Sequence, residues 1–210
     1  MITEQSTNST ISQYFVKIVN TLLTYLSVTS LGILIIFNSG TIYSLYGVPV
    51  KNYVYYIIIG FTFLIPLIVY SIKIFLTKLL QFTLTERYEL MFPSALQAIV
   101  LYFCYSILKQ HEVLVLINSF LLSQLLVTIF LLIFGFFSDT NIQISYWGSL
   151  LSLTFILLNS GFPYGFYVFF IVLLLTGVVA STILYLNINN QKSTYIWFFM
   201  GFFLTFLLCK

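Results

Sequence analysis

Residues 140–191 read TNIQISYWGSLLSLTFILLNSGFPYGFYVFFIVLLLTGVVASTILYLNINNQ and contain no charged side chain over 52 positions. A helix that crosses the hydrocarbon core of a bilayer needs about 20 predominantly apolar residues, so this run is long enough for two crossings. Hydrocarbon offers no hydrogen-bond partners to a bare backbone, so a chain that enters it folds as helices or as a closed barrel. The run lacks the period-2 alternation of barrel strands and therefore predicts a pair of membrane helices.

The same scarcity of charge extends over the rest of the chain. Of its 210 residues 60% are hydrophobic and 6% are charged, with a mean hydropathy of +1.07, whereas soluble domains carry about 25% charged residues. We expect an all-α protein, a polytopic transmembrane helix bundle. A polar N-terminal tail, 1–13, precedes one helical domain, 14–210. Its six to seven spans are expected near 19–38, 54–76, 91–108, 113–137, 143–159, 163–186 and 194–209.

Two prolines bear on the boundaries and shape of these helices. The turn-forming cluster Asn159-Ser160-Gly161-Phe162-Pro163 divides the long uncharged run, and its proline suits the first turn of the following helix. Pro66 falls in the middle of the second span, where a proline removes a backbone hydrogen bond and is expected to kink the helix.

The chain shows no residue pattern that indicates catalysis, a cofactor or a metal ion. Its single histidine, His111, stands next to Glu112 between two predicted spans, and one imidazole with one carboxylate makes neither a metal cluster nor a triad. All five acidic residues lie at or beyond span ends, which argues against a transporter with a buried charged relay. The net charge of +3 is small and scattered, so nucleic acid is not an expected partner.

Several uncharged polar residues fall inside the predicted spans. Such side chains usually hydrogen-bond between helices, each contributing about 0.6 to 2 kcal/mol. We expect this packing role, and the lining of a ligand site remains the alternative. The residues concerned are Ser94, Gln97, Asn118, Ser119, Ser123, Gln124, Ser149 and Ser152.

Three segments follow a recognisable order along the chain. They are TERYELMFP at 85–93, IQISYWG at 142–148 and STILYLNIN at 181–189. Together they resemble the three motif regions of the type 2 phosphatidic acid phosphatase (PAP2) superfamily, especially the divergent small membrane members found in Bacteroidetes. The resemblance covers about residues 60–209, and the predicted spans place all three segments on one face of the membrane.

In that family the first motif supplies basic residues that hold phosphate, the second a general-acid histidine, and the third an arginine and a nucleophilic histidine. Here Arg87 is the basic residue left in the first motif, and the acid position falls on Ser145. In the third motif the arginine falls on Ile183 and the nucleophile on Asn189, while Tyr185 keeps its place. The resemblance therefore implies a PAP2-like bundle without catalytic residues, a pseudoenzyme.

The resemblance also implies membrane lipids as partners and the bacterial inner membrane as the location. The candidate lipid-phosphate pocket would then consist of Arg87, Gln143, Ser145, Tyr185, Asn189 and Lys192. A second interpretation is a structural subunit of a larger membrane complex, for example a respiratory assembly, with other membrane subunits as partners and no active site of its own.

Overall fold

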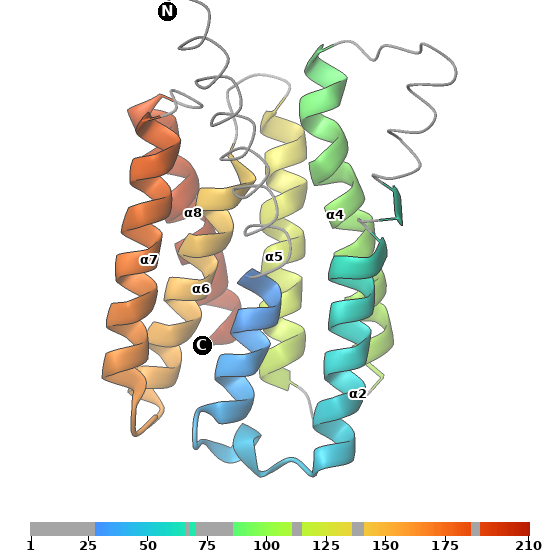
Figure 1. The fold of residues 1–210 in the computed structure, drawn as a ribbon, viewed down its shortest axis with the longest axis vertical. Coiled ribbons are helices and arrows are strands. Elements are labelled where there is room, and N and C mark those ends of the chain that lie inside the picture. The colour runs from blue at the N-terminus through green and yellow to red at the C-terminus, as the bar shows by residue number, and fades with distance from the viewer. Residues whose placement is uncertain (1–27, 66–67, 70–85, 111–114, 136–140, 186–189) are drawn as a thin grey trace, which may run out of the picture.

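A computed structural model describes residues 28–65, 68–69, 86–110, 115–135, 141–185 and 190–210 (Figure 1). This part of the chain is helical and contains no strand, as the sequence predicts. In order, its elements are the helix Val28–Asn38, the 3₁₀ helix η1 (Ile42–Leu45), α2 (Val48–Ile59), the π-helical segment η2 (Gly60–Leu64), α4 (Glu86–Leu108), α5 (Val115–Phe134), α6 (Ile142–Asn159), α7 (Gly165–Tyr185) and α8 (Gln191–Cys209).

Four of these helices, α5 to α8, are long and apolar enough to cross a membrane. Among the described residues, Val28–Asn38 and the Ser94–Leu108 part of α4 are shorter apolar helices. Residues 19–27 and 70–76, which belong to the first two predicted spans, lie outside the described part of the chain, as do the tail 1–13 and Pro66. The helix that leads toward Pro66 changes from α to π geometry at Gly60.

Several helices begin at other residues than the hydropathy predicts. α2 begins at Val48 rather than 54. Pro49 lies in its first turn, where the missing N–H of a proline costs no hydrogen bond, because N–H groups there have no partner within the helix. α4 begins at Glu86 rather than 91, because the polar turn ahead of the apolar run is helical too. Pro163 does not enter α7. It lies in the turn that precedes Gly165, where the Gly165 N–H donates to the Phe162 carbonyl.

α6 is the central helix of the described bundle and packs against α5, α7 and α8 (Figure 1). Asn141 caps its start, with the side-chain oxygen accepting from the backbone N–H of Gln143 at 2.9 Å. Two glycines let α6 and α8 approach closely. A Cβ at Gly148 would meet the Phe198 carbonyl, and one at Gly201 would meet the Ser145 carbonyl. Small residues at helix contacts are typical of membrane bundles.

Successive helices run in opposite directions. As Figure 1 shows, α4, α6 and α8 begin at the same end of the bundle at which α5 and α7 end. We call this the α8-start end. The opposite end holds η1 and the beginning of α2. The described parts of the three motif segments, at the start of α4, the start of α6 and the end of α7, therefore lie at the α8-start end.

The α6–α8 contact can be tested with a methyl group. We expect Gly201→Ala to destabilise the purified protein in detergent by about 1–3 kcal/mol, because the added methyl meets backbone atoms that cannot turn away. The readout is the midpoint of thermal unfolding. Gly177→Ala in α7 is the matched control, because a Cβ there meets nothing within 4 Å. Equal midpoints for the two variants would contradict the proposed close contact.

Candidate functional site

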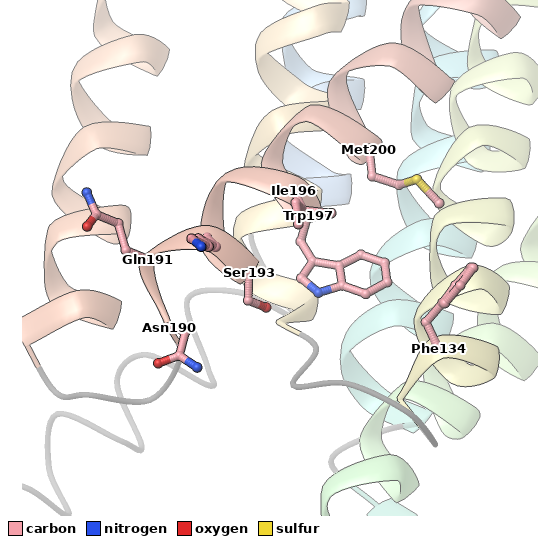
Figure 2. Close-up of a pocket in the computed structure, with 8 residues that line it drawn as sticks. Phe134, Asn190, Gln191, Ser193, Ile196, Trp197 and Met200 are labelled. Atoms are coloured by element: carbon pink, nitrogen blue, oxygen red, sulfur yellow. The ribbon is translucent and has the colours of Figure 1, made fainter.

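A pocket of about 790 Å³ lies where α8 begins (Figure 2). Its walls come from the first three turns of α8 and from the last residue of α5. The lining residues are Phe134, Asn190, Gln191, Lys192, Ser193, Ile196, Trp197 and Met200. The four polar residues are consecutive at the helix start, and the apolar ones follow along α8 or face it from α5. The pocket is therefore polar at the end of the bundle and apolar further along α8.

The first turn of α8 sets the polar part of the pocket. Asn190 occupies the N-cap position in extended conformation, and its carbonyl accepts from the backbone N–H of Thr194 at 3.0 Å. The hydroxyl of the buried Thr194 donates to the same carbonyl at 3.2 Å. Both bonds lie within the first turn of α8 and fix its start locally. Gln191 and Lys192 are exposed at the pocket.

An aromatic pair forms the apolar wall. The rings of Phe134 on α5 and Trp197 on α8 lie with centroids 6.1 Å apart at an interplanar angle of 62°. Trp197 is only 5% exposed, so its ring is fixed by packing, whereas Phe134 and Ile196 are 43% and 61% exposed. Figure 2 shows Met200 beside this pair. The wall thus combines one rigid ring with accessible apolar surface.

The polar part of the pocket favours an anion. Lys192 carries a positive charge in the first turn of α8, and that turn holds no acidic residue. The start of a helix also carries a partial positive charge from its unpaired backbone N–H groups. A phosphate or carboxylate group would meet both positive charges there.

The predicted site residues do not all belong to this pocket. Lys192 lines it. Gln143 lies in the first turn of α6, and Tyr185 is 86% exposed at the end of α7; neither lines the pocket. The Arg87 backbone lies in the first turn of α4, but its side chain and the whole of Asn189 fall outside the described part of the structure.

Ser145 does not line the pocket either. Its side chain is fully buried, and its hydroxyl donates to the Asn141 carbonyl at 3.1 Å. Its own carbonyl accepts from the Ser149 hydroxyl and faces Gly201 of α8. Ser145 therefore belongs to the contact between α6 and α8.

Most of the residues that line the pocket were not predicted, although the sequence contains a signal for them. Ser193, Ile196, Trp197 and Met200 recur at i, i+3, i+4 and i+7, which places them on one face of α8. Phe134 gave no such signal, because its place opposite Trp197 depends on how α5 packs against α8.

A chain of buried polar groups crosses the bundle interior. The Thr29 hydroxyl donates to Gln124 Oε1 at 2.6 Å, and the Thr128 hydroxyl donates to the Gln124 carbonyl at 2.7 Å. The hydroxyls of Thr128 and Tyr146 lie 2.6 Å apart. The buried Gln97 of α4 has no hydrogen-bond partner at its Nε2 among the described residues. The chain of bonds connects the helix Val28–Asn38 with α5 and α6.

Further polar contacts connect α8 and α4 with their neighbours. The Thr205 hydroxyl donates to Ser123 Oγ at 3.0 Å, and the Ser149 hydroxyl donates to the Gly201 carbonyl at 3.2 Å. Asn118 Nδ2 donates to the Leu108 carbonyl at 3.4 Å. Ser123, Gln124, Ser149 and Asn118 thus have the interhelical packing role that we expected for polar residues inside the spans.

Metal-ligating groups do not gather in the described part of the chain: no three His, Cys, Asp or Glu residues there come close enough to hold an ion. The chain matches no protein-family model, no curated protein and no solved structure.

The interior hydrogen bonds predict a measurable contribution to stability. Thr128→Val should lower the free energy of unfolding in detergent by about 0.6–1.7 kcal/mol, because it removes the bond to Tyr146 while it keeps the volume of the side chain. Thr182→Val is the control, since the Thr182 hydroxyl donates to the Val178 carbonyl of its own helix. Denaturant titration followed by circular dichroism gives both values, and equal losses would refute the interhelical role.

Proposed function

We propose that this chain is a multi-pass integral membrane protein of six to seven spans that binds an anionic lipid headgroup and lacks phosphatase activity. We also propose a PAP2-like fold and a place in the bacterial inner membrane. The four helices that are long and apolar enough to cross a membrane support the membrane location. The common end at which α4 and α6 begin and α7 ends supports the PAP2-like arrangement of the three motif segments.

The observation that carries the proposal is the two-part lining of the pocket at α8. A membrane lipid has an anionic headgroup joined to apolar chains. Lys192 and the start of α8 match the headgroup, and the apolar wall of Ile196, Trp197 and Met200 matches the chains. The pocket also lies at the end of membrane-length helices, where the headgroups of a bilayer would lie.

The residues at the motif positions support the lack of phosphatase activity. Ile183, which takes the place of the phosphate-binding arginine, is fully buried and apolar. Ser145, at the position of the acid, has its hydroxyl bonded to the Asn141 carbonyl. An amide stands at the nucleophile position, Asn189, and cannot form the covalent intermediate of the family.

The surface of α7 favours a second candidate function, that of a structural subunit in a larger membrane complex. α7 is the least buried of the four membrane-length helices and packs mainly against α6. Its exposed side carries the ring pair Phe166 and Phe170, with centroids 4.6 Å apart, next to Leu174. A stoichiometric partner that crosslinks to this side of α7 would favour the subunit over the lipid-binding protein.

The lipid site is tested by removal of its charge. We expect Lys192→Gln to weaken the binding of phosphatidic acid by about tenfold, because a charge-assisted contact contributes about 1.5–3 kcal/mol. Native mass spectrometry of the purified protein with added phosphatidic acid and phosphatidylcholine measures both affinities. Lys109→Gln is the matched control, because Lys109 lies over the Tyr105 ring at the opposite end of the bundle. A loss that is the same for both lipids, or for both variants, would argue against a headgroup site at Lys192.

The lack of phosphatase activity is tested separately. The purified protein should release no inorganic phosphate from phosphatidate or from a polyprenyl pyrophosphate, with or without added divalent cations. The measurement is a colorimetric phosphate assay over several hours, with a known lipid phosphatase as the positive control. Phosphate release that depends on the dose of the wild-type protein would refute the pseudoenzyme.

A further inference from the structure

The segment between the helix Val28–Asn38 and α2 exposes apolar side chains in an ordered array. Ile42, Leu45 and Val48 are 74%, 80% and 69% exposed. In a 3₁₀ helix the side chains at i and i+3 are aligned, so Ile42 and Leu45 of η1 form a row. Val48 follows at the start of α2, after the extended Tyr46 and Gly47. We call these three residues the aliphatic ridge.

Several polar groups of this segment are bonded within it or to the start of α2. The Ser44 N–H and hydroxyl both donate to the Thr41 carbonyl, at 2.9 and 2.7 Å. The Lys51 ammonium donates to the Ser44 carbonyl at 2.7 Å. The hydroxyls of Ser39 and Thr41 lie 2.5 Å apart. These bonds reduce the number of polar groups that need partners from outside, and hydrocarbon supplies none.

The aromatic side of the segment faces the bundle. The Tyr46 ring packs edge-on against the buried Phe37, with centroids 6.2 Å apart, and Tyr43 follows at 6.4 Å from Tyr46. Gly40, in the left-handed region at φ 67°, lies against Pro163 of the turn before α7. The segment is thus held to the bundle by its tyrosines and its turn, and the ridge faces outward.

This orientation is the reverse of that expected for a turn in water. Full exposure of an aliphatic side chain forgoes about 1.5–3 kcal/mol of burial energy, and a turn in water normally directs its polar groups outward. The exposed apolar surface also continues from the ridge onto α2, where Tyr56 and Ile59 are 76% and 46% exposed. The ridge is therefore continuous with a helix face that the proposed membrane location assigns to lipid.

We propose that the aliphatic ridge inserts among the phospholipid acyl chains of the leaflet at this end of the bundle. The ammonium of Lys51 donates to the Ser44 carbonyl and lies 6.0 Å from the centroid of the Phe37 ring, so the cation is held against η1 and the bundle beside the ridge. This inference rests on the proposed membrane location and is independent of the pocket at α8. It assigns the connection between the first two helices a role as a membrane anchor.

The experiment places a fluorescent probe on the ridge of the full-length protein. Cys209 is replaced by Ala, the fully buried Cys104 is kept, and NBD is attached to Leu45→Cys or, as the matched control, to Gln110→Cys. Gln110 is exposed and follows the last residues of α4 at the same end of the bundle. Both proteins are reconstituted in phosphatidylcholine vesicles, with iodide on both sides of the membrane or with nitroxide-labelled acyl chains as quenchers.

We expect the ratio of lipid quenching to iodide quenching to be at least about threefold higher at Leu45 than at Gln110, because the ridge probe contacts acyl chains. Val48→Cys should behave as Leu45→Cys does and serves in its place if Leu45→Cys does not fold. Equal ratios would show a ridge in water and would overturn the proposal. Shielding from both quenchers that disappears on dilution with lipid would show a second copy of this chain on the ridge, and would overturn it too.

Flotation of the vesicles after carbonate extraction measures whether the protein is integrated in the membrane, independently of the probe on the ridge. Protein that does not float contradicts the proposed function and the ridge together. Protein that floats while its Leu45 probe is as accessible to iodide as the Gln110 probe contradicts the ridge alone. The two failures are therefore distinguishable in one preparation.

Discussion

The close contact of α6 with α8 is the interaction on which the rest of the described structure depends. Gly148 and Gly201 bring the backbone of each helix against carbonyls of the other, so the two helices have one relative position that side chains cannot adjust. α5 and α7 pack against α6 at its other sides. α5 also packs directly against α8, and this second contact places Phe134 opposite Trp197 at the pocket.

In the interior of this bundle, hydroxyl and amide groups rather than charged groups connect the helices. The bond from Thr29 to Gln124 connects helices that are distant in sequence, and the pair of Thr128 and Tyr146 connects the consecutive helices α5 and α6. Most of the groups involved are neutral and bonded at one or two atoms, which keeps the desolvation cost low in an apolar interior. Ser152 Oγ and Gln124 Nε2 are exceptions, since neither has a partner among the described residues.

The two ends of the bundle differ in the way that polar groups are used. At the α8-start end, Lys192 and the first turn of α8 present positive charge to an open pocket. At the opposite end, Lys51 is bonded to the Ser44 carbonyl, and the exposed aliphatic ridge consists of Ile42, Leu45 and Val48. The proposed ligand site and the proposed membrane anchor therefore lie at opposite ends, and a change at one has no direct contact through which to affect the other.

The sequence by itself determined the helical class and the approximate positions of α5 to α8. Hydropathy and turn residues such as Asn159 and Gly161 act over a few positions, and they are readable without the fold. The helices α2 and α4 begin several residues before the predicted spans, because helix formation continues through polar residues such as Lys51 and Glu86 that hydropathy excludes.

Only the tertiary structure decided which side of each helix faces which neighbour. It moved Ser145 from the predicted pocket into the α6–α8 contact and placed Phe134 opposite Trp197. In the structure the aliphatic ridge faces away from the bundle and the ring of Tyr46 faces the bundle. The physical reason is that an all-round apolar helix has no amphipathic stripe to set its rotation, so the rotation follows from close packing between residues far apart in the chain.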